Sequence, residues 1–165
     1  MSGAVLCLII MRGMIFTINF GLMGKNRYTV IVGCGRLGAN LANILSERGE
    51  NVLIIDKNKD AFRKLSPAFS GITLAGDATY LNVLHEAEME SATAVVSVTN
   101  YDNTNILIAL IAKEMFGIKH VIARLYDPDR EYVYNEFNID TISPAELSFK
   151  EIDKLMSIYE TEGGV

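Results

Sequence analysis

Histidine, cysteine and tryptophan are scarce, since the 165 residues contain two histidines, two cysteines and no tryptophan. Cys7 and Cys34 lie in unlike contexts and form no CxxC pair. The sequence therefore indicates neither a disulfide framework nor a zinc site, and it fits a reducing cytoplasm. His85 and His120 are expected to be surface or packing residues rather than catalytic ones. Basic residues are in deficit too, because the net charge is −5, which argues against nucleic acid as the main partner.

Motifs for chemistry on a bound ligand are also missing. The sequence contains no Tyr-x-x-x-Lys pair of the kind found in nicotinamide dehydrogenases, and no GK[ST] phosphate loop for ATP hydrolysis. The pattern described below predicts no second half that would hold a substrate. We therefore expect a protein that binds a ligand and reports its presence, rather than an enzyme.

Residues 1–26 are predicted to be an apolar segment outside the main domain. Two apolar runs of about ten residues each are separated by Arg12. Each run is shorter than the roughly 20 residues that span a bilayer, and joining them would bury Arg12 at a cost of about 2.5–3.5 kcal/mol. Three interpretations stay open: a wrongly assigned start, with the chain beginning at Met14 or Met23, a membrane anchor, or an arm that docks on a partner.

From residue 28 onward, short apolar runs alternate with segments of helical spacing, and we expect one domain over residues 27–146. The runs lack internal polar alternation, which is typical of parallel strands that are covered on both faces. Six such units predict a Rossmann-like, doubly wound α/β fold with six parallel strands in the order 3-2-1-4-5-6. The expected strands are 28–32, 51–55, 71–75, 93–98, 120–123 and 140–142, and the expected helices are 36–48, 60–65, 79–87, 102–116 and 129–137. Asp102 or Asn103 is the expected N-cap of the helix 102–116.

A last amphipathic helix is expected within residues 147–165, with Ile152, Leu155, Met156 and Tyr159 on one face. An apolar stripe is stable only when another surface shields it from water, so we predict a C-terminal crossover helix that binds a partner. No further domain is expected after it.

Residues 33–38 read GCGRLG, a GxGxxG motif that follows the first expected strand and opens the first expected helix. Gly33 allows a tight turn, Gly35 lets a phosphate approach the backbone, and Gly38 lets the helix pack close to the sheet. The N–H groups that begin the helix then meet the anion. Asp56 ends the second strand, where it can accept hydrogen bonds from both ribose hydroxyls and disfavours a 2′-phosphate. The motif thus predicts a site for an adenine nucleotide or NAD(H) rather than NADP.

Further polar positions are candidates for contact with the nucleotide. Arg36 can reach a β- or γ-phosphate, or it can be a solvated arginine of the first helical turn. Asp77 follows the third strand and can accept from the adenine amine, with the small Ala78 leaving room for the ring, or it can simply cap the next helix. Thr99 and Asn100 end the fourth strand, at the switch point where ligands bind in such sheets.

Arg124 ends the fifth strand and can face a phosphate, or it can form a salt bridge with Asp127 or Asp129. No residue is assigned a catalytic or a metal-binding role. The predicted nucleotide contacts are Gly33, Cys34, Gly35, Arg36, Leu37, Gly38, Asp56, Lys57, Asp77, Ala78, Thr99, Asn100 and Arg124.

These motifs resemble the N-terminal Rossmann domain, or TrkA-N domain, of the RCK (KTN) family. The resemblance covers about residues 27–147 and rests on the runs 31–38 (IVGCGRLG), 52–56 (VLIID), 76–79 (GDAT) and 121–124 (VIAR), of which the GDAT turn is the most specific. Members of the family are cytoplasmic regulators of potassium channels and of Trk/Ktr potassium uptake systems. By position, the resemblance implies nucleotide contacts at Gly33, Gly35, Arg36, Gly38, Asp56, Asp77 and Ala78.

The resemblance also implies a ligand and partners. The ligand is ATP, ADP, AMP or NAD(H), and the chain is expected to assemble into a ring, from a dimer up to an octamer, under a membrane pore. It would be cytoplasmic and peripheral on the inner face of the cell membrane, with a potassium-channel membrane subunit as partner. Many members carry a C-terminal RCK domain that this sequence lacks, which implies a second RCK-type subunit as a further partner.

The sequence therefore predicts a non-enzymatic regulatory subunit of a potassium uptake system, in which nucleotide binding changes the ring and gates the pore. Two alternatives stay open. One is an NAD-dependent oxidoreductase module whose substrate half is another chain. The other is a freestanding nucleotide or redox sensor that acts on a different kind of partner.

Overall fold

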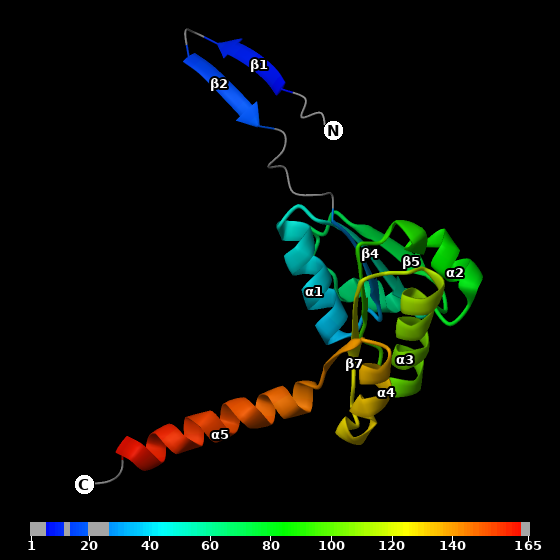
Figure 1. Ribbon diagram of the computed structural model, residues 1–165, viewed down its shortest axis with the longest axis vertical. Coiled ribbons are helices and arrows are strands. Elements are labelled where there is room, and N and C mark those ends of the chain that lie inside the picture. Colours follow the sequence, from blue (N-terminus) through cyan, green and yellow to red (C-terminus); the bar gives the residue numbers. More distant parts are fainter. Residues whose placement is uncertain (1–5, 12–13, 20–26, 163–165) are drawn as a thin grey trace.

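The computed structural model describes residues 6–11, 14–19 and 27–162 (Figure 1). The first two ranges are the strands β1 (Leu6–Met11) and β2 (Met14–Asn19), which pair with each other antiparallel. The rest of the segment 1–26, including Arg12, lies outside the described residues. Within the described part of the chain, no helix is both long and apolar enough to cross a membrane.

The main sheet has six strands, all parallel, in the order β5-β4-β3-β6-β7-β8. Counted from the first expected strand, this is the order 3-2-1-4-5-6, so the prediction of a Rossmann-like, doubly wound sheet is confirmed. The strands are β3 (Tyr28–Val32), β4 (Asn51–Asp56), β5 (Ile72–Ala75), β6 (Ala94–Ser97), β7 (His120–Arg124) and β8 (Asp140–Ile142).

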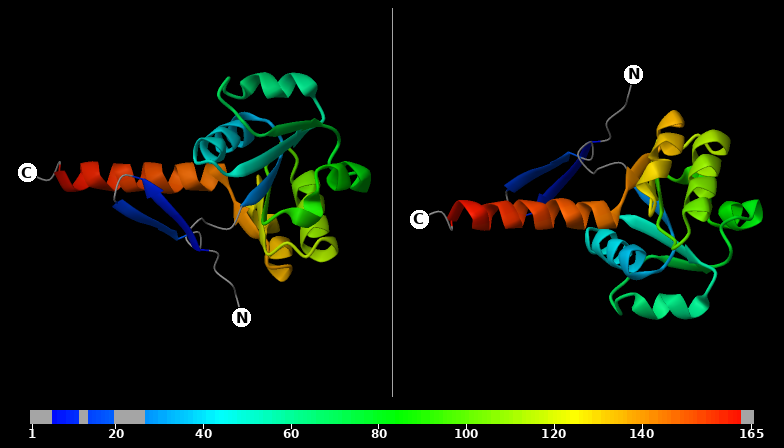
Figure 2. Two further views of the ribbon diagram at one scale, coloured as in Figure 1. Left: turned by 90° about the horizontal axis from the view of Figure 1, so that it is seen from above. Right: turned by 90° about the horizontal axis from the view of Figure 1, so that it is seen from below.

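Helices cover both faces of this sheet, as Figures 1 and 2 show. One face carries α1 (Arg36–Glu47) and the 3-10 helix η2 (Lys59–Lys64). The other face carries α2 (Leu81–Glu86), α3 (Asp102–Leu110) and α4 (Glu131–Glu136). The shorter elements are the 3-10 helices η3 (Met89–Ser91) and η5 (Pro128–Arg130) and the π-helix η4 (Ile111–Met115), which continues α3.

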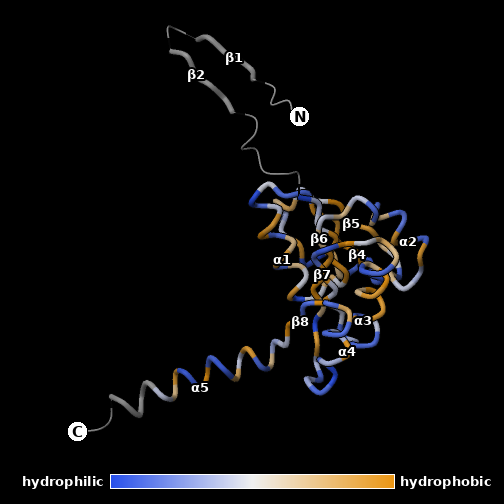
Figure 3. The backbone as a smooth tube through the Cα atoms, in the orientation of Figure 1, coloured by the Kyte–Doolittle hydropathy of each residue, from blue (hydrophilic) through white to orange (hydrophobic). Residues whose placement is uncertain are grey.

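The central strand β3 shows how one apolar run serves two cores. Val30 and Val32 belong to the core that includes residues of α2, α3 and α4, whereas Ile31 belongs to the core that includes residues of α1 and η2. All three side chains are buried, because successive residues of a strand point to opposite faces of a sheet that is covered on both. Figure 3 shows the resulting concentration of apolar residues in the sheet.

The start of α3 differs from the sequence-based expectation that Asp102 or Asn103 is its N-cap. The N-cap is Tyr101, and Asp102 is the first helical residue. The carboxylate of Asp102 instead accepts hydrogen bonds from the backbone N–H groups of Tyr126 at 2.9 Å and Asp127 at 3.0 Å. Asp102 therefore holds the loop after β7 in position. The local sequence cannot reveal this role, because both N–H groups that donate to Asp102 are distant in the chain.

The last helix, α5 (Pro144–Glu162), extends away from the sheet (Figures 1 and 2). It begins at Pro144 rather than at residue 147. Ile152, Leu155 and Met156, three members of the expected apolar stripe, are exposed to solvent in this chain. The fourth member, Tyr159, lies beyond the residues whose side chains are described.

Tyr134 of α4 makes the stability of the domain dependent on alkaline pH. Its side chain is buried, its hydroxyl donates to the backbone oxygen of Asp102 at 3.2 Å, and burial raises its pKa from 10.0 to about 12. As pH rises, the unfolded state loses this proton first, so we expect the free energy of unfolding to fall between pH 10 and pH 12. Urea titrations over this range should show a shallower decline for Tyr134→Phe. An equally steep decline in the variant would contradict the assignment.

Candidate functional site

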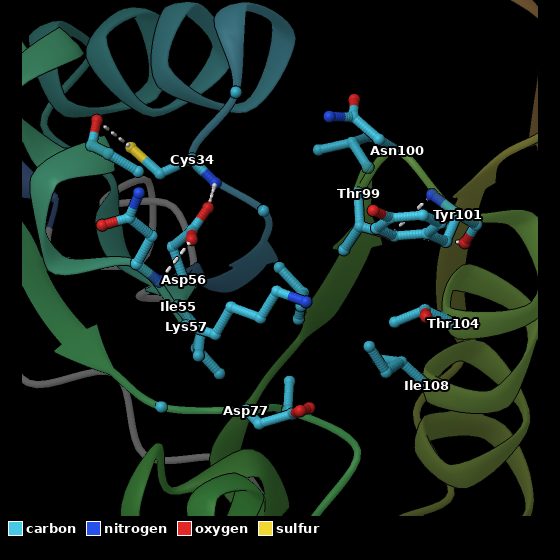
Figure 4. A pocket seen from close by; sticks show the side chains of 18 of the residues that line it. Cys34, Ile55, Asp56, Lys57, Asp77, Thr99, Asn100, Tyr101, Thr104 and Ile108 are labelled. Atoms are coloured by element: carbon cyan, nitrogen blue, oxygen red, sulfur yellow. Dashed lines mark hydrogen bonds between the residues drawn. The ribbon is translucent and has the colours of Figure 1, made fainter.

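A cleft of about 270 Å³ opens at the carboxyl ends of β3, β4, β5 and β6, the edge where ligands bind in doubly wound sheets. Figure 4 shows Asp56 and Lys57 on one wall and Thr99 and Tyr101 on the opposite wall. The predicted contacts that line the cleft are Gly33, Cys34, Gly35, Asp56, Lys57, Asp77, Ala78, Thr99 and Asn100. The fold thus brings together residues that follow four different strands.

Each glycine of the motif has its own geometric reason. Gly33 has φ +103°, and a Cβ there would lie 3.0 Å from the backbone nitrogen of Thr99. A Cβ at Gly38 would overlap the carbonyl oxygen of Gly33, so α1 can pack this close only without a side chain at that position. Gly35 differs, since a Cβ there would meet no atom within 4 Å. The open space in front of Gly35 is where the motif predicts that a phosphate approaches.

The start of α1 offers backbone donors to an anion. Gly35 is the N-cap in an extended conformation, and among the described residues no side chain caps this helix and no acidic residue lies in its first turn. The first N–H groups of a helix have no intrahelical acceptor, and the helix dipole favours negative charge at this end. This end of α1 is therefore suited to a phosphate group.

Asp56 ends β4 and is fastened to the glycine turn. Its Oδ2 accepts a hydrogen bond from the backbone N–H of Cys34 at 2.7 Å, and its Oδ1 accepts one from the N–H of Asn58 at 2.8 Å. Each carboxylate oxygen has a further lone pair, so the anchored group can still accept hydrogen bonds from ribose hydroxyls. The geometry at Asp56 therefore combines a fixed position with spare acceptor capacity.

The thiol of Cys34 faces away from this chemistry. It is fully buried, and its Sγ donates to the carbonyl oxygen of Ala61 at 3.4 Å. Burial, with a smaller effect of the Asp56 charge, raises the pKa of the thiol. A buried thiol with a raised pKa is a poor nucleophile, so Cys34 contributes its backbone N–H to the site and its side chain to packing.

Asp77 stabilises its own turn. Its Oδ1 accepts hydrogen bonds from the backbone N–H of Thr79 at 3.0 Å and from the Thr79 hydroxyl at 2.7 Å, and these bonds lower the pKa of Asp77. The N-cap of α2 is Tyr80, so the interpretation of Asp77 as the cap of the next helix is wrong. The neighbouring Ala78 is buried and lines the cleft, where its small side chain leaves room beside Asp77.

Asn105 of α3, which is not among the predicted site residues, organises the opposite wall. The residue is fully buried. Its Oδ1 accepts from the Thr99 N–H at 2.9 Å, from the Thr99 hydroxyl at 2.7 Å and from the Ser97 hydroxyl at 3.1 Å. Its Nδ2 donates to the carbonyl oxygens of Thr99 at 3.2 Å and Arg124 at 3.0 Å. One side chain thus fixes the ends of both β6 and β7.

Three residues of the glycine motif lie outside the lining of the cleft. Arg36 and Leu37 have exposed side chains in the first turn of α1. Gly38 acts through the close packing of α1 described above.

Arg124 also lies outside the lining, next to it on β7. Its Nη1 donates to Oδ1 of Asn100 at 3.4 Å, and its guanidinium carbon lies 5.0 Å from the centre of the Tyr126 ring. It forms no ion pair with Asp127 or Asp129, which are both described, so the salt-bridge alternative is wrong. Its Nε is buried and has no hydrogen-bond partner among the described residues.

Several lining residues are not part of the sequence-based set. Asn58, Gly76, Thr79 and Tyr101 follow the ends of strands, so a systematic search of strand ends would have found them. Lys64, Thr104 and Ile108 come from helices, where no local signal marks them as part of a cleft.

The model of the TrkA-N domain matches residues 29–144. The chain is 41% identical over 116 residues to the Trk system potassium uptake protein TrkA of Streptomyces coelicolor, covering 70% of this chain and 52% of that protein. It is 35% identical over 109 residues to a TrkA homolog of the Trk potassium uptake system of Pyrococcus abyssi, covering 66% and 48%. The chain therefore spans about half the length of the curated relatives it matches.

Solved structures share the fold at lower identity. The GsuK channel bound to NAD superimposes with a TM-score of 0.71 at 23% identity, covering 83% of this chain and 24% of that one. GsuK bound to ADP gives a TM-score of 0.68 at 23% identity, covering 81% and 34%. The Kef CTD of Shewanella denitrificans in its AMP-bound form gives 0.66 at 19% identity, covering 84% and 83%. At these identities, the likeness shows the fold.

Proposed function

The chain belongs to the TrkA-N domain family, and on that premise we propose that it is a nucleotide-binding regulatory subunit of a potassium uptake system. Two of its relatives are named as Trk system potassium uptake proteins. Because the chain spans about half of their length, potassium uptake is part of the proposal. Its ligand is an adenine nucleotide (ATP, ADP or AMP) or NAD(H), bound in the cleft at the carboxyl edge of the sheet.

One observation carries the proposal: the open space at Gly35 and the anchored carboxylate of Asp56 lie in the same cleft. A nucleotide uses both, because backbone N–H groups at the start of α1 can bind its phosphates while Asp56 accepts from its ribose. The structures of similar fold that hold NAD, ADP and AMP support the same class of ligand.

Regulation by such a domain is a population shift. The cleft can bias two arrangements of a ring only if it binds the nucleotide with different affinity in each of them. The ring contains from two to eight copies of this chain, or copies mixed with a second RCK-type subunit. It lies in the cytoplasm on the inner face of the cell membrane, where it gates the pore of a potassium-channel membrane subunit.

The segments of the chain have separate roles in this proposal. Residues 27–146 form the nucleotide-binding domain, and residues 147–165 bind a partner through the exposed stripe of α5. Residues 1–26 are an arm, an anchor or a wrongly assigned start. No residue acts as a catalyst, in line with a cleft whose lining contains no histidine and whose thiol is buried.

A thermal-shift panel on the full chain tests the site. A ligand at ten times its dissociation constant stabilises the folded state by about 1.4 kcal/mol. We expect ATP, ADP, AMP, NAD or NADH to raise the melting temperature, and NADPH at the same concentration to raise it less because Asp56 disfavours a 2′-phosphate. Inorganic phosphate is the control for binding by charge alone. The absence of a shift with every adenine ligand would overturn the proposal.

A further inference from the structure

Lys57 and Tyr101 lie on opposite walls of the cleft. Lys57 follows β4 and Tyr101 follows β6, and β3 lies between these two strands in the sheet. A contact between their side chains therefore passes over the end of β3, where the glycine turn begins. Figure 4 shows the Lys57 side chain extending toward Tyr101, between Cys34 on the glycine turn and Asp77.

The two side chains make a cation–π contact. The ammonium nitrogen of Lys57 lies 5.6 Å from the centre of the Tyr101 ring, within the range of such contacts. The ammonium forms no hydrogen bond or ion pair of the usual length with any described residue, although Asp56 and Asp77 line the same cleft. Among the described residues, its contact is therefore with the ring, while its charge also helps to lower the pKa of Asp77 across the cleft.

The backbone of Tyr101 is fixed by the wall behind it. Tyr101 is the N-cap of α3, and its carbonyl oxygen accepts a hydrogen bond from the N–H of Asn105 at 2.9 Å. Its own N–H donates to the Thr99 hydroxyl oxygen at 3.3 Å. The residue is 63% exposed, so Tyr101 lies at the mouth of the cleft rather than in the core.

We propose that this Lys57–Tyr101 contact, the bridge, spans the cleft and competes with the nucleotide for it. The inference rests on the proposed function, because it assumes that the cleft takes a nucleotide. A ligand that reaches from the glycine turn to Asp77 crosses the path of the Lys57 side chain, so the bridge has to open before the ligand binds. Only the open fraction of the protein is competent to bind, which raises the apparent dissociation constant in proportion.

A double-mutant cycle measured by isothermal titration calorimetry tests the bridge, with ADP and NAD as probes and the full chain as the protein. Tyr101→Ala is expected to lower the dissociation constant roughly two- to fivefold, the range of an exposed cation–π contact. Tyr101→Phe keeps the ring and is expected to match the wild type. In a Lys57→Ala background, Tyr101→Ala is expected to change nothing. The comparison in the Lys57→Ala background is needed because Lys57→Ala alone also removes a positive charge from the cleft, which changes the affinity for an anionic ligand by itself.

Tyr132→Ala is the matched control, because Tyr132 is 66% exposed on α4 and lies outside the lining of the cleft. Unchanged or weaker binding by Tyr101→Ala would overturn the bridge. So would an equal tightening in the Lys57→Ala background, since the ring would then act without the ammonium. If the wild type binds neither ADP nor NAD, the proposed function fails together with the bridge, whereas normal wild-type binding with unaltered variants overturns the bridge alone.

Discussion

Replacing Asp56 by alanine is expected to weaken ADP binding about 10- to 100-fold, as measured by isothermal titration calorimetry. A hydrogen bond to a charged acceptor contributes about 1.5–3 kcal/mol, and the anchored carboxylate is placed to receive the ribose hydroxyls. The Asp56 side chain is held in advance by the N–H groups of Cys34 and Asn58. Because the carboxylate is already fixed, the wild type binds the ribose without the entropic cost of ordering this side chain. The Asp56→Ala variant loses the full contribution of these hydrogen bonds to the free energy of binding.

The matched control for this variant is Asp60→Ala. Asp60 is an exposed aspartate of η2 that pairs with Arg63 at 3.1 Å and lies outside the lining of the cleft. Its removal changes the net charge by the same amount, so we expect its effect on the dissociation constant to stay within about twofold. If the Asp56→Ala protein is folded and binds ADP as tightly as the wild type, the assignment of Asp56 to the ribose site is contradicted.

A second readout separates the ribose role of Asp56 from its structural role. The carboxylate repels a 2′-phosphate, so the wild type is expected to bind NADH more tightly than NADPH. Asp56→Ala should narrow that difference, because the repulsion disappears along with the hydrogen bonds. A variant that merely loosened the glycine turn would weaken both ligands by the same factor and leave their ratio unchanged.

The sheet could be predicted from the sequence because each strand carries its own signal. Strands that are covered on both faces appear as short apolar runs, and β3 and β4 are found within a residue of the expected ranges. The glycine turn was predictable for the same kind of reason. Gly33 and Gly38 are required by contacts within the first strand-helix unit and with the end of β6, so the spacing alone marks them.

The wall formed by α3 could not be predicted, because it depends on contacts between distant segments. Asp102 binds N–H groups of the loop after β7, and Asn105 joins the ends of β6 and β7. A helical sequence pattern does contain a hint, since Asn105 shares a face with Ile108, Ala109 and Ala112. A single polar residue on an otherwise buried face indicates a buried hydrogen-bond network, but not which groups it joins.

Asn105→Leu is expected to lower the free energy of unfolding by about 3–5 kcal/mol, as measured by urea denaturation. The leucine keeps the volume of the side chain but removes every hydrogen bond that Asn105 makes. The hydroxyl of Ser97 would then lose a partner in a buried position, and the N–H of Thr99 and the carbonyl oxygen of Arg124 would lose one in partly buried positions. Each buried polar group without a partner costs about 1–3 kcal/mol, and this cost exceeds the gain from an added apolar side chain.

Asn103→Ala is the control on the same helix, because Asn103 is exposed and, within the described part of the chain, its side chain makes one hydrogen bond, from Nη1 of Arg130 at 2.6 Å. Its effect is expected to stay within about 0.5 kcal/mol, as for other surface positions. A loss of less than about 1 kcal/mol in Asn105→Leu would contradict the network. The same variant should weaken ADP binding even where it stays folded, because Thr99, which lines the cleft, depends on Asn105 for its position. Substitution of Asn105 is therefore expected to change both the free energy of unfolding and the dissociation constant for ADP. Substitution of Asp56 is expected to change mainly the dissociation constant.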